Sequence, residues 1–167
     1  MNVLETPRLS LREMTPADAG QLIAGTPGDG VRWAPGYPSP GDLRAAARLL
    51  AACADTGDPS PFGSYEIRLR TDEAVIGGMG FHGAPDEHGG VTIGYGLVES
   101  ARGKGYASEA LRALIRFARQ QGAARVLGDA DVDNVASQHV MTAAGMRLVA
   151  EDDALRYYLV DWPQAHR

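Results

Sequence analysis

Residues 102–107 read Arg-Gly-Lys-Gly-Tyr-Ala, and the prediction of the fold starts from this short stretch. It lies directly between a predicted strand, residues 91–97, and a predicted amphipathic helix, residues 106–121. The two glycines allow the backbone to come close to a ligand, and the first free N–H groups of the helix point into the turn. The helix dipole adds partial positive charge, and Arg102 and Lys104 add full charges. The stretch therefore predicts an anion site suited to a pyrophosphate.

Other phosphate-binding loops fit this stretch less well. A Walker loop would read G-x-x-x-x-G-K followed by Ser or Thr, and this stretch does not. A dinucleotide fingerprint, G-x-G-x-x-G, fits at Gly103 and Gly105 but finds Ser108 at its third position. Asp129 and Asp131 do lie at roughly the right distance for a ribose contact, but the strands before the loop look antiparallel rather than parallel. A dinucleotide fold and a tight turn without a ligand remain as alternatives.

The pattern of hydrophobic residues predicts strands and helices before and after this loop in the sequence. Residues 64–70, 74–82 and 91–97 are joined by connections too short for helices, which predicts antiparallel strands. Residues 125–130 follow a helix and should run parallel to their predecessor. Further strands are predicted at 8–13, 146–151 and 154–161, with helices ending near 25 and at 43–55, 106–121 and 135–144. The pattern is that of an α/β (α+β) fold, a central mixed and mostly antiparallel sheet of about seven strands flanked on both faces by about four helices.

Two helix starts carry the same capping signal, a hydroxyl residue, then proline, then an acid three positions after the cap. The first is Thr15-Pro16-Ala17-Asp18 and the second is Ser39-Pro40-Gly41-Asp42. Between these helices, residues 26–41 carry four prolines, together with Trp33 and Tyr37. This loop is either a mobile lid that displays aromatic rings to a substrate or a surface loop whose rings are pinned to the core.

One face of the strand at residues 91–97 is almost bare. Val91, Ile93, Tyr95 and Leu97 share one face, whereas Thr92, Gly94 and Gly96 share the other. The second face therefore leaves room for a ligand.

Length and composition exclude several classes of protein. The 167 residues suggest one domain over 1–167, and 16 Lys plus Arg against 21 Asp plus Glu give a net charge of −5. No apolar run is long enough for a membrane span, and the first residues lack the apolar region of a signal peptide. A single cysteine, Cys53, allows neither an internal disulfide nor a cysteine-based zinc site. We expect a cytoplasmic protein that binds no metal, no nucleic acid and no membrane.

Residues 102–107 match the R/Q-x-x-G-x-G/A signature of the GNAT superfamily of acyl-CoA-dependent N-acetyltransferases, and the chain resembles the RimJ/RimL-like branch. Three further segments carry that resemblance in the same order along the chain. They are residues 5–12, Ile93-Gly94-Tyr95, and the stretch from Asn134-Val135-Ala136-Ser137 to Ala144-Gly145-Met146. The resemblance implies a GNAT fold, acetyl-CoA as co-substrate and direct attack of an amine on the thioester.

The resemblance also implies roles for individual residues. Leu97 and Val98 correspond to the strand end whose main chain pairs with the pantetheine arm and whose N–H polarises the thioester carbonyl. Asn134 matches an asparagine that bonds the pantetheine, or is a plain helix cap. Ser137 matches a serine proposed to protonate the leaving thiolate, or is an ordinary helical serine. The pyrophosphate loop corresponds to Arg102, Gly103, Lys104, Gly105, Tyr106 and Ala107.

The general base is where the chain departs from its relatives. An alkyl ammonium of pKa near 10.4 must lose its proton, which costs about 4.6 kcal/mol at pH 7. Many relatives carry a glutamate immediately before Ile-Gly-Tyr, but this chain has Thr92, and it has Ala101 where a tyrosine often stands. No base is assigned from the sequence. The substitutes considered are Asp129, Asp131, Asp133, His82, Tyr157 and Tyr158.

The missing base leaves more than one function open. The first hypothesis is an N-acetyltransferase that acts on a primary amine of a small molecule or of a peptide or protein N-terminus. The alternative is an acetyl-CoA-binding sensor or interaction module without catalysis, and a different acyl donor is a third. The acidic balance mildly favours a cationic acceptor. A homodimer is compatible with the resemblance, and no pattern in the sequence tests it.

Overall fold

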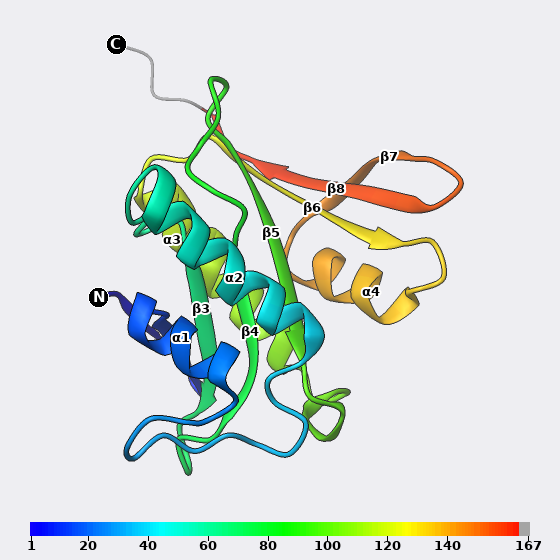
Figure 1. Ribbon diagram of the computed structural model, residues 1–167. Coiled ribbons are helices and arrows are strands. Elements are labelled where there is room, and N and C mark those ends of the chain that lie inside the picture. The colour runs from blue at the N-terminus through cyan, green and yellow to red at the C-terminus, as the bar shows by residue number, and fades with distance from the viewer. Residues whose placement is uncertain (164–167) are drawn as a thin grey trace.

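The computed structural model describes residues 1–163, so the last four residues of the predicted domain lie outside it (Figure 1). One eight-stranded sheet runs in the order β1-β2-β3-β4-β5-β6-β8-β7. Its strands are β1 (Val3–Glu5), β2 (Leu9–Glu13), β3 (Ser64–Leu69), β4 (Val75–Phe81), β5 (Gly90–Leu97), β6 (Arg125–Asp131), β7 (Arg147–Glu151) and β8 (Leu155–Asp161). The helices are α1 (Pro16–Ala24), α2 (Pro40–Asp55), α3 (Tyr106–Gln120) and α4 (Val135–Ala143), with a short 3-10 turn at Glu99–Ala101.

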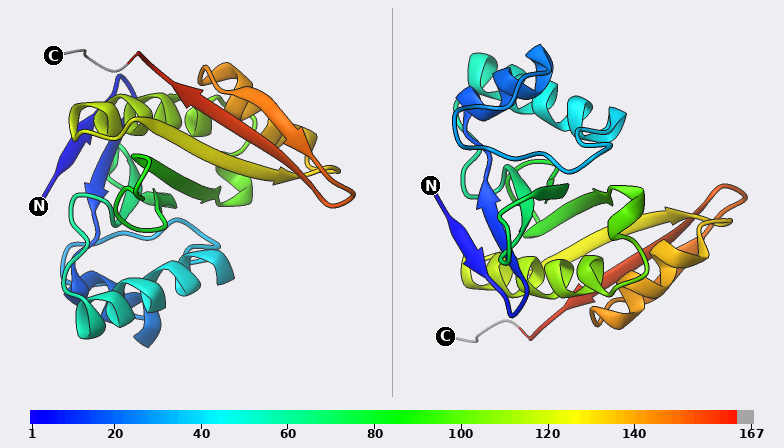
Figure 2. Two further views of the ribbon diagram at one scale, coloured as in Figure 1. Left: turned by 90° about the horizontal axis from the view of Figure 1, so that it is seen from above. Right: turned by 90° about the horizontal axis from the view of Figure 1, so that it is seen from below.

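The helices cover both faces of the sheet, as the sequence predicts. Helices α1 and α2 lie together on one face, and α3 and α4 lie on the other (Figure 2). All strand pairs are antiparallel except β5 with β6, because α3 carries the chain back between them. The mixed, mostly antiparallel sheet with four helices is confirmed. The eighth strand, β1, was not predicted, because three residues before Pro7 are too few to show an alternating pattern.

Strands β5 and β6 are paired over only part of their length. Their register joins residues 90–92 to residues 125–127, and beyond Thr92 the two strands diverge (Figure 1). Main-chain groups on that edge of β5 therefore have no neighbouring strand to bond to. This opening in the sheet is where the candidate site lies.

Both predicted capping signals form capping boxes. Thr15 accepts the N–H of Asp18 at 3.1 Å, and the Asp18 carboxylate accepts the N–H of Thr15 at 2.9 Å. Ser39 and Asp42 repeat this exchange at the start of α2. Each box satisfies donors that the first turn of a helix leaves free, which fixes where α1 and α2 begin.

Helix α3 provides the buried centre of the molecule. Leu111 and Leu114 are fully buried, and Phe117 packs edge-on against Tyr65 of β3 at a ring distance of 6.0 Å. The predicted apolar stripe of this helix is buried along its whole length, at Ala107, Ala110, Leu111, Leu114, Ile115 and Ala118. Within residues 1–163, no helix combines the length and the apolar character that crossing a membrane requires.

The loop between α1 and α2 is pinned to the sheet. Ala34 donates its N–H to the carbonyl of Val75, and Val75 donates its own to Arg32, at 3.0 and 2.8 Å. Tyr37 is buried and meets Trp33 edge-on at 5.7 Å. Of the two interpretations of this loop, the structure favours the pinned one over the mobile lid.

Candidate functional site

A cleft of about 430 Å³ opens where β5 and β6 diverge, between the start of α3 and the start of α4. Most of the residues that the sequence singled out line it together. They are Leu97, Arg102, Gly103, Gly105, Tyr106, Ala107, Asn134 and Ser137, joined by Tyr95, Gly96, Ser108, Ala136 and Val140. Two predicted residues, Val98 and Lys104, do not line it. We call this cavity the donor cleft.

The glycine loop has the geometry that an anion site needs. Gly103 and Gly105 adopt left-handed φ angles of 76° and 83°, which turn the chain from β5 into α3. Gly105 is the cap of α3 and has no side chain to bond the N–H groups of the first turn. Those donors, the positive end of the helix dipole and the Arg102 guanidinium therefore all converge on one wall of the cleft.

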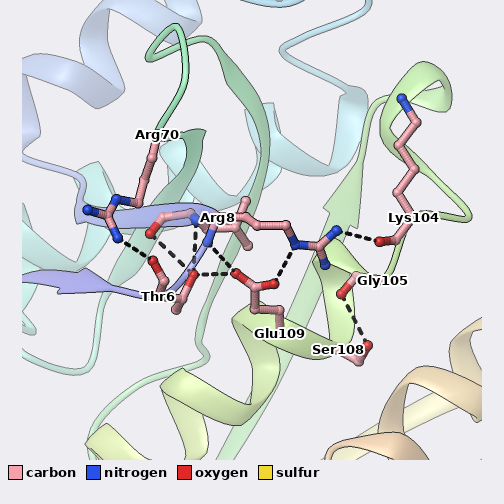
Figure 3. Close-up of polar contacts among 8 residues, drawn as sticks. Thr6, Arg8, Arg70, Lys104, Gly105, Ser108 and Glu109 are labelled. Atoms are coloured by element: carbon pink, nitrogen blue, oxygen red, sulfur yellow. Dashed lines mark hydrogen bonds and ion pairs between the residues drawn. The ribbon is translucent and has the colours of Figure 1, made fainter.

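A clamp from the N-terminal segment holds this loop in place (Figure 3). Arg8 donates from Nη1 to the carbonyl of Lys104 at 2.8 Å and from Nε to Glu109 of α3 at 2.7 Å. Its guanidinium also lies over the Tyr106 ring, 4.4 Å from the centroid. Thr6 donates its hydroxyl to Glu109 at 2.6 Å. Residues 5–12 are one of the segments that carry the family resemblance, and through Thr6 and Arg8 they support the glycine loop.

The carboxylate of Glu109 is the centre of this clamp. Partial burial opposes its ionisation, but hydrogen bonds from Thr6 and Arg8 prevail and lower the pKa of Glu109 below its usual value. The main-chain N–H of Arg8 adds a third bond at 2.9 Å. A charged Glu109 therefore anchors the segment before β2 to the first turn of α3 at neutral pH.

The end of β5 presents main-chain groups to the cleft at Leu97 but not at Val98. Val98 is buried and donates its N–H to the carbonyl of Ile76 at 2.8 Å, so this N–H is not free for a ligand. Because Leu97 faces Gly77 in the antiparallel register, its own N–H and carbonyl point away from β4 and into the opening. Arg102 accordingly donates from Nε to the Leu97 carbonyl at 3.1 Å.

Two hydroxyl groups meet on the α4 side of the cleft. The Oγ of Ser137 lies 2.6 Å from the hydroxyl oxygen of Tyr95, and either can be the donor. Burial raises the pKa of Tyr95, and its bond to Ser137 opposes this. Asn134 caps α4 by accepting the N–H of Ser137 at 3.1 Å on Oδ1, which leaves its amide NH₂ for a ligand. In this geometry Asn134 can cap α4 with its oxygen and bond the pantetheine with its NH₂ at the same time.

A second cavity, of about 290 Å³, lies on the other face of the sheet under α2. Its floor consists of Gly78, Gly80, Gly94 and Gly96, and the register places Gly78 opposite Gly96 and Gly80 opposite Gly94. The face without bulky side chains that was predicted at residues 92–96 is therefore present, and the glycines of β4 extend it to the neighbouring strand. Tyr95 and Gly96 line both cavities. We call this second cavity the acceptor cavity.

Asp42 and His82 stand over opposite corners of this floor. A methyl group on Gly78 would come within 2.6 Å of Asp42 Oδ1, and one on Gly94 within 3.0 Å of His82 Nε2. A methyl group on Gly96 would have no atom of the described chain within 4 Å, so this corner is open. The sequence indicates only a capping role for Asp42, because the placement of its second oxygen depends on how α2 packs.

The pKa values of Asp42 and His82 are shifted in opposite directions. Burial raises the pKa of Asp42 above its usual 3.8, against hydrogen bonds from Ser39 that lower it. Partial burial and the charge of Arg48 lower the pKa of His82 below its usual 6.5, and Asp129 opposes this. The lowered pKa favours neutral His82 at pH 7, and burial disfavours the charged form of Asp42.

The other bases considered from the sequence lie outside both cavities. Asp131 and Asp133 border a separate depression, and Asp129 acts on His82 only through its charge. Tyr157 donates its hydroxyl to Asp152 at 2.8 Å, and Tyr158 is buried. Within residues 1–163, no three His, Cys, Asp or Glu side chains gather as a metal would require.

Comparison with known proteins places this geometry among relatives. The profile of the acetyltransferase (GNAT) domain matches residues 8–147. The uncharacterized N-acetyltransferase YoaA of Bacillus subtilis is 26% identical over 158 residues, which cover 94% of this chain and 88% of YoaA. YjdG of the same bacterium, also an uncharacterized N-acetyltransferase, is 35% identical over 88 residues, and the match spans 52% of each chain, about half the length of YjdG.

Among solved structures, one similar fold is that of RimL, a ribosomal L7/L12 alpha-N-protein acetyltransferase in complex with coenzyme A. It superposes with a TM-score of 0.69 at 18% identity, over 96% of this chain and 98% of that chain. At this identity the similarity bears on the fold alone.

Proposed function

This chain belongs to the GNAT family of acetyl-CoA-dependent N-acetyltransferases, and we propose that it transfers the acetyl group to a primary amine held in the acceptor cavity. The observation that supports this most directly is the shared wall of the two cavities. Tyr95 and Gly96 line both, and the corner above Gly96 is open. A thioester in the donor cleft and an amine in the acceptor cavity can therefore meet at this point of β5.

The residues present fit the donor. The first-turn N–H groups of α3 and the Arg102 guanidinium suit the pyrophosphate, and Arg8 holds the loop that carries them. The outward N–H and carbonyl of Leu97 suit an amide of the pantetheine arm. The free NH₂ of Asn134 provides a further donor on the opposite wall. When bound, acetyl-CoA supplies an activated acetyl group, and the chain supplies position and proton transfer.

Proton transfer is assigned to groups on each side of the shared wall. On the donor side, Ser137 gives a proton to the departing thiolate, and the Tyr95 hydroxyl at 2.6 Å orients and replenishes it. On the acceptor side, Asp42 stands over Gly78, directly opposite Gly96, where its Oδ1 takes the proton of the amine. Its raised pKa makes it a better base than an ordinary aspartate.

The acceptor cavity also bears on the alternative of a sensor without catalysis. Binding acetyl-CoA alone requires only the donor cleft. A second cavity that shares Gly96 and holds a carboxylate supports transfer over sensing.

A substitution at Gly96 tests the shared wall. Gly96 has no left-handed φ and open space at its Cβ, so Gly96→Val should fold normally while filling the junction. The assay is release of coenzyme A thiol from acetyl-CoA with a panel of primary amines. We expect the native protein to acetylate at least one amine and Gly96→Val to lose about a hundredfold or more. Gly20→Ala, which also has open space at its Cβ, is the matched control.

Two results would count against the proposal. The first is a native protein that binds acetyl-CoA but acetylates no amine of the panel, which would favour the sensor. The second is a Gly96→Val variant as active as Gly20→Ala, which would place the reaction elsewhere.

A further inference from the structure

The charges around the acceptor cavity are not those of the whole chain. One face of α2 lines it, and that face carries a single carboxylate, Asp42, followed by two guanidinium groups, Arg44 and Arg48. None of the three forms an ion pair within residues 1–163, whose ion pairs lie elsewhere. The chain has a net charge of −5, yet the lining of this cavity is net positive.

Asp42 and Arg48 lie toward opposite ends of the cavity, and the Arg44 guanidinium lies beside Gly41 at the start of α2. Asp42 stands over Gly78, at the end where Gly96 opens to the donor cleft. Arg48 lies toward the other end, because it and His82 border the same small cavity beyond the floor and its charge acts on His82. Six residues of helix separate Asp42 from Arg48, a rise of about 9 Å.

Each end of the cavity suits a different group of one ligand. An unpaired carboxylate that is half-buried gains most from an ammonium placed against it, and that ammonium is then beside Gly96. The unpaired Arg48 guanidinium at the far end repels a second ammonium and attracts a carboxylate or phosphate. An uncharged tail would leave Arg48 without a partner.

We propose that the acceptor is a small amphoteric amine, a primary amine joined by a short spacer to an anionic group that Arg48 binds. This rests on the proposed function and names its substrate class. The cavity volume of about 290 Å³ suits a molecule of this size. It also replaces the expectation of a cationic acceptor, which came from the net charge of the whole chain, with one drawn from the charges that face the ligand.

Three probes with the same six-carbon chain test the proposal. They are 6-aminohexanoate, hexylamine and 1,6-hexanediamine, each titrated into ¹⁵N-labelled protein saturated with coenzyme A. The readout is the shift of the Gly94 and Gly96 amide signals. We expect 6-aminohexanoate to bind about tenfold more tightly than either other probe at low salt. A fourth probe, 6-aminohexyl phosphate, distinguishes a carboxylate from a phosphate as the preferred anion, and tighter binding of either supports the class.

Variants identify the groups responsible. Arg48→Ala should remove most of the preference for 6-aminohexanoate over hexylamine, whereas Arg116→Ala, an exposed arginine on α3, should preserve it. Equal or tighter binding of hexanediamine, or no amide shift with any probe while coenzyme A is bound, would overturn the proposal. Failure of the proposed function would look different, because the protein would then acetylate no amine at all, whichever probe it binds.

Discussion

The hydroxyl pair of Tyr95 and Ser137 shows what a single contact can contribute to this site. The two residues lie 42 positions apart, on β5 and α4, and their oxygens are 2.6 Å apart on the donor side of the shared wall. A lone serine on a helix is free to rotate, whereas the tyrosine fixes the direction of this one. We therefore regard Ser137 as the acid and Tyr95 as the residue that positions it.

Substitution of these hydroxyls should lower turnover without weakening donor binding. Ser137→Ala is expected to reduce kcat by about 10- to 100-fold with little change in the KM for acetyl-CoA. Tyr95→Phe should lower kcat less. The double variant should be no slower than Ser137→Ala, because both changes remove one proton path. Fully additive effects in this double-mutant cycle would show that the hydroxyls act independently.

Asp42 combines a structural role with a chemical one. Asp42→Asn keeps an oxygen for the Ser39 N–H but removes the charge, so we expect kcat/KM to fall about a hundredfold. Because burial raises the pKa of Asp42, the charged form is disfavoured in the fold, and the melting temperature should stay level or rise. In the native enzyme the rate should decline as pH falls through this raised pKa. The pH–rate profile of Asp42→Asn should not show this decline. Asp55→Asn, at the exposed end of α2, is the control, and equal activity of the two variants would remove Asp42 from the mechanism.

At the scale of elements, the N-terminal segment positions the loop through one side chain. The Arg8 side chain, immediately before β2, bonds both the carbonyl of Lys104 and Glu109 of α3, and it alone among the bonds of this clamp reaches the glycine loop itself. Arg8→Ala should therefore raise the Kd for acetyl-CoA about tenfold, since the first-turn donors of α3 lose their fixed direction. Glu109→Gln should act in the same direction, and calorimetry measures both. An unchanged Kd in Arg8→Ala would mean that the loop keeps its shape without the clamp.

Elements set by local chemistry were predictable from the sequence. The capping boxes at Thr15 and Ser39 lie within four residues, and the apolar stripe of α3 repeats every three to four positions, so both were predicted correctly. The three-residue β1 was missed because it is shorter than the pattern used to detect strands.

The site was predictable only where its residues lie close together in the chain. The glycine loop could be proposed as a site because its residues are consecutive in the sequence. The contacts of Tyr95 with Ser137 and of Arg8 with Lys104 join residues 42 and 96 positions apart, and no periodicity reports them. The register with β4 turns the N–H of Val98 toward Ile76, which the sequence alone does not report. The role of Asp42 over Gly78 depends on the packing of α2, which the sequence leaves open.

At the scale of the whole molecule, partial burial at the acceptor cavity should be visible in the stability of the fold. The pKa of His82 is lowered below 6.5, so between that lowered value and 6.5 the unfolded chain binds more protons than the folded one. Stability from this group therefore rises as pH rises through that window. The melting temperature of the native protein relative to His82→Gln should increase from pH 5 to pH 7. A constant difference would show that His82 titrates as it does in the unfolded chain.

The proposed acetyl transfer requires the glycine loop to be the donor site. Isothermal titration calorimetry with acetyl-CoA tests this most directly, with Ser108→Glu as the critical variant. Ser108 lines the donor cleft in the first turn of α3, where a glutamate suits the helix but places a carboxylate against the pyrophosphate. Ser100→Glu, outside the cleft, is the matched control. We predict micromolar binding by the native protein and by Ser100→Glu, and no measurable binding by Ser108→Glu. Absence of binding by the native protein, or undiminished binding by Ser108→Glu, would contradict the account.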